Sequence, residues 1–390
     1  MKKLIYIALA VLTLAACSNE DDFNKSSNQK AIGFKTSINA DTRANSGFCQ
    51  INKPNEIQVW SCVPNETGFK PYFENEAYKF NNSLSLYLAK NENYRYWTGS
   101  DMYFFAYSVD RDNNGNSKNI SNIGWTSDGS LLECDYTNPM EPQNQYDFIY
   151  ASSGRYGNNG WGTASGFYYA SLYFRHALSQ IEFKAKTTSG ELYVEIVEVK
   201  LTNVRTKGHY TFPTSTSGSY STHDSPSVGN VYQNDRGVWS NVTGTGNCKA
   251  TFEPIGFVMS DGVVSLTEVD TEKFGEGQNV NGTNTEDQKE FNNNTMYMIP
   301  QDAFKTSNIV VKAKIWEMSD PSKGHQATDT QIFPDPELSS DYAEISFGIP
   351  NNWIEGKRHV YTLIFRKPNR LSFSVNVDDY DLNSNEVVTY

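Results

Sequence analysis

The sequence predicts an all-β protein built from two β-sandwich domains in tandem. Short segments in which apolar and polar residues alternate recur along the 390 residues, as expected for strands with one buried face. No segment carries a convincing apolar stripe of helical period. The 24 Tyr, 22 Phe and 7 Trp residues, with many Asn, Ser, Thr and Gly residues, favour strands joined by turns. A chain of this length can form two hydrophobic cores.

Strands are expected in the N-terminal half wherever alternation or a short apolar run occurs. These segments are residues 32–38, 56–60, 83–88, 102–109 and 147–151. The segment 102–109 is apolar or aromatic apart from Ser108 and predicts a strand buried on both faces. Loops rich in Asn and Gly are expected at residues 110–122 and 154–166.

Residues 174–186 predict one strand that contains a β-bulge. Apolar residues alternate in one phase from Phe174 to Leu178, and in the opposite phase from Ile181 to Ala185. A shift of one residue within a strand is what a bulge produces.

Alternation resumes in the C-terminal half between two long polar stretches, residues 214–247 and 270–294. Strands are expected at residues 197–201, 296–300, 309–315, 341–347, 359–365 and 371–377. The sequence is therefore expected to divide into four parts. They are a signal peptide at 1–16, a lipidated leader with a removable first strand at 17–43, an N-terminal β-sandwich at 44–170 and a C-terminal β-sandwich at 171–390.

The N-terminus predicts export. Lys2 and Lys3 precede an apolar run at residues 4–14 that is too short to span a bilayer. Residues 14–17, Leu-Ala-Ala-Cys, resemble a lipobox, whose cysteine takes up lipid after signal cleavage. The acidic residues 20–22 resemble the surface-export signal of Bacteroidetes lipoproteins. We therefore expect Cys17 to carry an outer-membrane anchor and the mature chain to be otherwise soluble; a Cys17 that merely follows an ordinary cleavage site is the alternative.

The remaining cysteines and the net charge narrow the function classes. An even set of four cysteines in an exported protein permits two disulfides or isolated buried thiols, and the sequence leaves both open. The four are Cys49, Cys62, Cys134 and Cys248. The net charge is −12, and the sequence contains no basic stripe, so binding to nucleic acid is excluded.

Arg43, followed by Ala44, lies between the expected first strand and the remaining domain. A cut after Arg43 would detach the first strand and the lipid together. Arg111 and Arg155 lie in segments that look equally loop-like, but only Arg43 has this position.

Several segments together resemble the fimbrillin family, in particular its Mfa-like branch. They are residues 174–179 (Phe-Arg-His-Ala-Leu-Ser), 298–301 (Met-Ile-Pro-Gln), 356–361 (Gly-Lys-Arg-His-Val-Tyr) and 371–380, in that order. His359 and Tyr380 stand where the family usually has an aromatic residue and Trp. The resemblance spans nearly the whole chain and implies two transthyretin-like sandwiches in a type V pilus subunit of stalk, tip or accessory type.

The resemblance also implies a route of assembly at the cell surface. An arginine-specific protease cuts the lipoprotein precursor, the first strand leaves, and another pilin subunit supplies a strand in its place. The departing side chains would be Ile32, Phe34 and Ile38. The candidate donor strand has the same alternation at Leu371, Phe373, Val375 and Val377. Alternatively, this C-terminal strand completes its own domain.

Catalytic and metal motifs are weak. The sequence contains no H-E-x-x-H, G-x-S-x-G or P-loop motif, and we expect no enzyme activity and no cofactor, although a sandwich can bring distant carboxylates together. Asp110, Asp112 and Asn114 before Gly115 resemble the start of a calcium loop, but Ser121 replaces the final Glu. An Asn-Gly turn is the preferred interpretation, so no metal site is assigned.

The competing function is a glycan-binding surface lipoprotein. Trp125, Trp161 and Trp239 lie in polar segments rich in Gly and Asn, where exposed aromatic rings can stack on sugars. The preferred interpretation is that these rings pack loops against the sandwiches.

Overall fold

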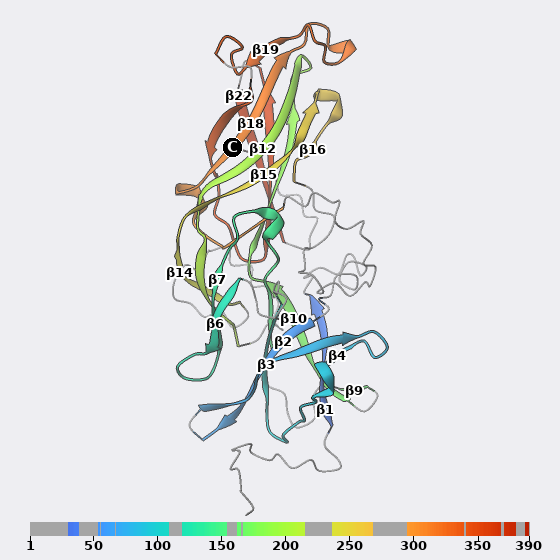
Figure 1. Cartoon of the computed structure of the whole chain (residues 1–390), viewed down its shortest axis with the longest axis vertical. Helices are drawn as coiled ribbons and strands as arrows, with labels where there is room; N and C mark the ends of the chain where they lie inside the picture. The colour runs from blue at the N-terminus through green and yellow to red at the C-terminus, as the bar shows by residue number, and fades with distance from the viewer. Residues whose placement is uncertain are drawn as a thin grey trace, which may run out of the picture.

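The computed structural model shows an elongated, all-β molecule (Figure 1). It describes residues 30–38, 54, 56–66, 68–108, 119–153, 162–164, 167–214, 236–267, 295–338, 341–367, 370–379 and 387–389. The predicted all-β class is confirmed, while the transthyretin-like subtype stays a prediction. In the part of the chain described, no helix has the length and apolar character that a membrane crossing requires.

The lower part of the molecule in Figure 1 contains a sheet that closes on itself. Its order is β1-β4-β3-β2-β5-β8-β10-β9, and an additional pairing joins β1 to β10. The strands are β1 (Ala31–Ile38), β2 (Glu56–Asn65), β3 (Gly68–Asn81), β4 (Leu86–Ala89), β5 (Tyr103–Ser108), β8 (Ile149–Ser152), β9 (Gly162–Ala164) and β10 (Phe167–His176). A closed sheet has one fully enclosed face, and the apolar cluster that includes Phe34, Val59 and Phe104 fills it.

A four-stranded sheet in the order β14-β13-β7-β6 accompanies the closed sheet. Its strands are β6 (Ile120–Trp125), β7 (Leu132–Thr137), β13 (Lys207–Thr211) and β14 (Val238–Thr243). A second aromatic cluster packs residues such as Phe105 and Tyr150 of the closed sheet against Tyr136 and Tyr210 of this one. We call these two sheets together the N-terminal unit.

The C-terminal unit is a sandwich of two sheets around one apolar core. One sheet consists of β11 (Ser179–Thr187), β16 (Val264–Ser265), β17 (Met296–Met298), β21 (Lys357–Arg366), β22 (Arg370–Asp379) and β23 (Val387–Thr389). The other consists of β12 (Leu192–Val204), β15 (Gly246–Phe257), β18 (Asn308–Glu317), β19 (Thr330–Phe333) and β20 (Ala343–Gly348). Short 3₁₀ helices lie at Lys90–Glu92, Pro142–Asn144, Met259–Asp261, Ala303–Lys305 and Pro321–Lys323.

The predicted bulged strand at 174–186 is wrong, because the segment forms two strands. β10 ends at His176 and β11 begins at Ser179, and the two belong to different sheets. Phe174 is buried in the core of the closed sheet, whereas Ile181 is buried in the core of the C-terminal sandwich. The change of phase therefore marks the point where the chain passes from one unit to the other.

The proposed division at residue 170 stays a prediction, and strand pairing runs across that position. β10 spans it, and β13, which follows it in sequence, pairs with β7, which precedes it.

Candidate assembly site

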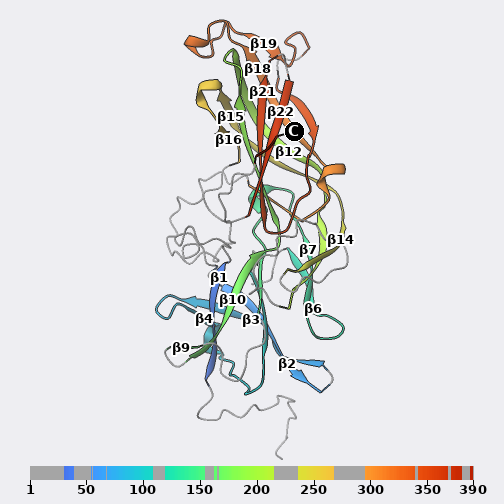
Figure 2. The same cartoon turned by 180° about the vertical axis from the view of Figure 1, so that it is seen from behind.

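β1 lies inside the closed sheet with a neighbour on each edge (Figure 2). It runs parallel to β10 over its whole length, from Ala31 opposite Phe167 to Ile38 opposite Phe174. On the other edge, Phe34 pairs with Tyr87 of antiparallel β4. The first strand is therefore an internal strand that joins β4 to β10.

The start of β1 is fixed by a third segment, residues 95–97. The Ile32 N–H donates to the Arg95 carbonyl oxygen at 2.8 Å, and the Trp97 N–H donates to the Lys30 carbonyl oxygen at 3.3 Å. These bonds extend the antiparallel edge beyond the short β4, so that both edges of β1 are hydrogen-bonded near its N-terminal end.

The side chains of β1 alternate between the core and the surface. Ile32 and Phe34 are fully buried, whereas Lys35 is exposed and places its ammonium group 5.7 Å from the centre of the Tyr169 ring. The Phe34 ring meets Tyr78 and Phe104 edge-on, at 4.8 and 5.1 Å between ring centres. Edge-to-face pairs of this kind stabilise aromatic cores beyond the area they bury.

Loss of β1 would leave an empty groove between β4 and β10. Burial of one such apolar side chain contributes about 1.5–3 kcal/mol, and the paired edge of β10 would become a row of unpaired backbone groups. The vacated groove would present unpaired backbone N–H and C=O groups along β10 and an aromatic pocket between Tyr78 and Phe104.

The other predicted assembly residues fall in different places. Cys17, Arg43 and Ala44 lie outside the described residues. Ile38 is the last residue of β1, where the backbone pairing is described and the side chain is not. The candidate donor residues Leu371, Phe373, Val375 and Val377 lie on β22. β22 pairs antiparallel with β21 along its full length and with β23 on its other edge.

The described cysteines are separate thiols. Cys62, Cys134 and Cys248 are buried thiols, while Cys49 lies outside the described residues. Burial raises the pKa of the Cys62 thiol to about 12 and raises that of Cys134 as well. Neither thiol is therefore a nucleophile near neutral pH.

The tryptophans proposed for glycan stacking are packed where they are described. Trp239 is buried, and its indole N–H donates to the Ala177 carbonyl oxygen at 2.8 Å. Trp125 donates to Glu74 at 2.6 Å, and its ring lies edge-on to Trp60 and Phe105. Trp161 and the calcium-like segment 110–115 lie outside the described residues; Ser121 lies in β6.

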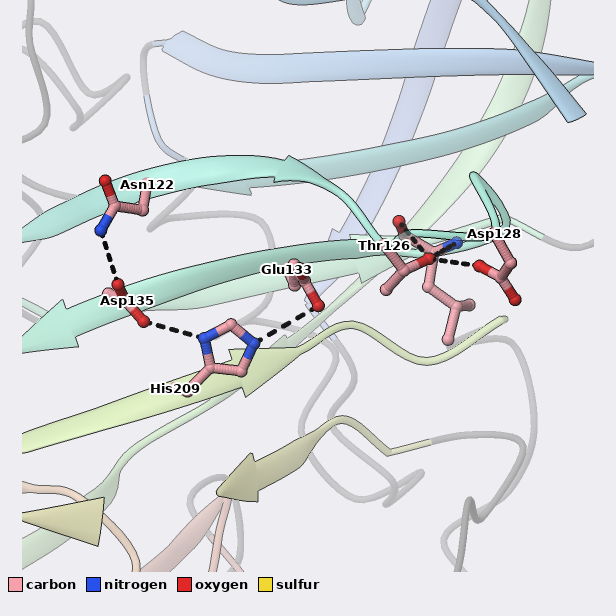
Figure 3. Close-up of polar contacts among 7 residues, drawn as sticks. Asn122, Thr126, Asp128, Glu133, Asp135 and His209 are labelled. Atoms are coloured by element: carbon pink, nitrogen blue, oxygen red, sulfur yellow. Dashed lines mark hydrogen bonds and ion pairs between the residues drawn. The ribbon is translucent and has the colours of Figure 1, made fainter. Parts of the chain in front are cut away.

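A polar cluster that the sequence did not suggest lies across β6, β7 and β13 (Figure 3). His209 Nδ1 is 2.8 Å from Asp135 and Nε2 is 3.4 Å from Glu133, while Asn122 donates to Asp135 at 2.7 Å. The bonds from Asn122 and His209 lower the pKa of Asp135. The sequence pattern could not bring His209 to this cluster, because β13 is far from β6 and β7 in sequence. Among the described residues, no group of His, Cys, Asp and Glu side chains is arranged to hold a metal ion.

Sequence comparison identifies the family to which the chain belongs. The model of the fimbrillin-like family matches residues 42–379. The chain belongs to the fimbrillin-like family. Membership supports a pilus or adhesion subunit at the cell surface. No curated protein matches the sequence.

One solved structure supports the fold of this fimbrillin-like chain, and a second aligns with it at a lower score. A fimbrial protein from Bacteroides vulgatus aligns with a TM-score of 0.55 at 14% identity, over 90% of this chain and 99% of that one. A protein from Bacteroides uniformis, described as a candidate cell adhesion protein, aligns with a TM-score of 0.45 at 12% identity, over 92% and 100% of the two chains.

Proposed function

We propose that this fimbrillin-like chain is a stalk, tip or accessory subunit of a surface pilus that assembles by strand exchange. In this proposal the chain is exported as an outer-membrane lipoprotein through Cys17 and is cut after Arg43 by an arginine-specific protease. It acts as a structural subunit without catalytic activity or cofactor. The observation that carries the proposal is the position of β1, which is internal, hydrogen-bonded on both edges and anchored by Phe34.

The cut would turn a covalently attached strand into a bound peptide. An attached strand occupies its groove at a high effective concentration, which cleavage removes. A partner strand can then restore the ladder along β10, with alternate side chains filling the vacated pockets. The residues that bind β1 would thus become the binding site for the next subunit.

The pattern of β1 agrees with the candidate donor residue by residue. When residues 371–377 are aligned with residues 32–38, Phe373 takes the place of Phe34 and Leu371 takes that of Ile32. Ser372 takes the place of Gly33, where an added Cβ would lie 3.4 Å from Leu88. We propose that a β22 strand from a second copy enters the groove in this register, with Phe373 in the pocket between Tyr78 and Phe104.

Protease treatment tests the assembly. After incubation with an arginine-specific protease, the chain should form ladders that survive SDS, and mass spectrometry should place the new N-terminus at Ala44. An Arg43→Ala variant should remain a monomer. A surface form that retains residues 17–43, or ladders formed equally well by Arg43→Ala, would contradict the proposal.

A pair of variants tests the register. Phe373→Glu places a charge in the aromatic pocket and should abolish the ladder, whereas Ser374→Glu, on the opposite face of the same strand and aligned with exposed Lys35, should leave it intact. Because Phe373→Glu also affects the chain's own β22, a synthetic peptide of residues 370–379 provides a second measurement. The native peptide should bind the cut protein, and the Phe373→Glu peptide should not.

A further inference from the structure

One of the contacts between the two units is a turn that projects from the C-terminal unit, residues 353–357. The turn closes through the Lys357 N–H, which donates to the Ile354 carbonyl oxygen at 3.2 Å. Gly356 adopts a φ of 66°, which favours glycine. Ser179 and Leu178, at the crossing between the units, bond to Ile354 and Gly356 respectively. The turn is therefore tied to the connection between the two units.

The carboxyl group at the tip of this turn reaches into the N-terminal unit. Glu355 Oε1 accepts hydrogen bonds from the hydroxyls of Tyr150 at 2.5 Å and Tyr210 at 3.1 Å. Tyr150 belongs to β8 of the closed sheet and Tyr210 to β13 of the four-stranded sheet, and both are fully buried. One carboxyl oxygen thus joins three sheets from both units.

A buried polar network holds the base of the turn. The Trp353 indole N–H donates to the Tyr361 hydroxyl at 3.0 Å, and that hydroxyl donates to Asn351 Oδ1 at 2.8 Å. Asn351 Nδ2 lies 2.8 Å from His359 Nδ1. Because both stems of the turn are fixed in this way, Glu355 is presented to the tyrosines by a rigid support.

Four groups among the described residues act on the Glu355 carboxyl group. Tyr150 and Tyr210 donate hydrogen bonds, and Arg236, before β14, and Arg175, at the end of β10, add positive charge. Removal of the partly buried carboxyl group from water raises its pKa from 4.5 to about 7 and outweighs the four groups, all of which lower the pKa. Removal from water is the larger effect because the charged form loses its hydration.

We propose that Glu355 is a proton-operated latch that docks the C-terminal unit onto the N-terminal unit when its carboxyl is neutral and loosens that contact when it ionises. The sign follows from proton linkage. A carboxyl group whose pKa is raised by docking binds its proton more tightly in the docked state, so docking is strongest below pH 4.5 and weakens as pH rises through about 7. The latch does not depend on strand exchange.

Hydrogen exchange of the intact chain tests the latch. After correction for intrinsic exchange rates, protection of the turn 353–357 should fall about tenfold or more between about pH 5.5 and about pH 8.5. Glu355→Gln removes the titrating group and should abolish this pH dependence. Glu344→Gln, which removes an exposed carboxyl paired with Lys200, should retain it.

Tyr150→Phe supplies an independent measurement if Glu355→Gln perturbs folding. Loss of one hydroxyl donor should raise the carboxyl pKa further and move the midpoint of the protection change to higher pH. Protection of the wild-type turn that does not change with pH would overturn the proposal. An equal pH dependence in wild type and Glu355→Gln would also overturn it, as would a midpoint in Tyr150→Phe that stays in place or moves to lower pH.

Discussion

Phe34 is the side chain that fixes the first strand most firmly. Its ring is fully buried and contacts aromatic rings from β3 and β5. Lys35, its neighbour on the same strand, faces solvent. Adjacent residues of β1 therefore differ sharply in what they contribute to the stability of the fold, as the alternation of the sequence predicts.

Phe34→Ala should destabilise the uncut chain by about 3–5 kcal/mol, because it leaves a cavity between Tyr78 and Phe104. Lys35→Ala, the matched control, should change stability by about 0.5 kcal/mol or less. Denaturant unfolding of both variants measures the difference. Equal effects in the two variants would mean that the N-terminal segment contributes little to the core.

The buried thiols lead to a second prediction at this scale. In the native protein, Cys62, Cys134 and Cys248 should resist a thiol reagent at about pH 8, because burial blocks access to all three and disfavours the thiolates of Cys62 and Cys134. All three should react once the protein is denatured. Peptide mapping of the labelled protein identifies each site, and rapid native labelling of any of the three would contradict the burial.

Element by element, local alternation predicted many strands but not their partners. Segments 56–60, 102–109, 309–315 and 359–365 all coincide with observed strands. β3 was missed, because its polar and aromatic residues do not alternate regularly, it contains Pro71, and its burial is irregular. The parallel pairing of β1 with β10 joins distant parts of the chain, which a local pattern does not specify.

The candidate site shows the same limit. The alternation correctly selected Ile32 and Phe34 as buried side chains. It could not supply Tyr78, which forms half of the Phe34 pocket, because β3 carries no clear signal. Likewise, His176 and His359 lie in segments that the pattern predicted as strands, and both are buried, but the turn between β20 and β21 that presents Glu355 had no motif of its own.

His359, on β21 after that turn, gives a pH prediction for the stability of the whole chain. Burial lowers the pKa of its imidazole from 6.5 to about 3. The unfolded chain therefore binds an extra proton below pH 6.5, and this residue should lower stability progressively as pH falls towards 3. Melting temperatures of wild type and His359→Gln should be compared between about pH 7 and about pH 4. The variant should lose less stability on acidification, and parallel curves would contradict the prediction.

At the scale of the whole molecule, the two units differ in how their terminal strands are paired. The N-terminal unit depends on a strand that precedes the proposed cut, whereas β22 of the C-terminal unit lies beside β21, its neighbour in sequence. Cleavage would therefore open one unit and leave the pairing of the other unchanged. A head-to-tail polymer requires one groove and one strand from each copy, so the proposed donor β22 would have to leave β21 and β23 before it enters the groove of another copy.

Removal of β1 should consequently produce a local change in hydrogen exchange. Once residues up to 43 have been cut and separated, amides of β10 that pair with β1 should exchange faster, because the parallel ladder along Phe167–Phe174 is lost. Amides of β12 and β18 pair only within the C-terminal unit and should keep their protection. Adding back a peptide of residues 30–38 should restore protection of β10, and a Phe34→Ala peptide should do so poorly. Uniform loss of protection in both units would indicate global unfolding, and unchanged exchange in β10 would mean that β1 does not hold the groove closed.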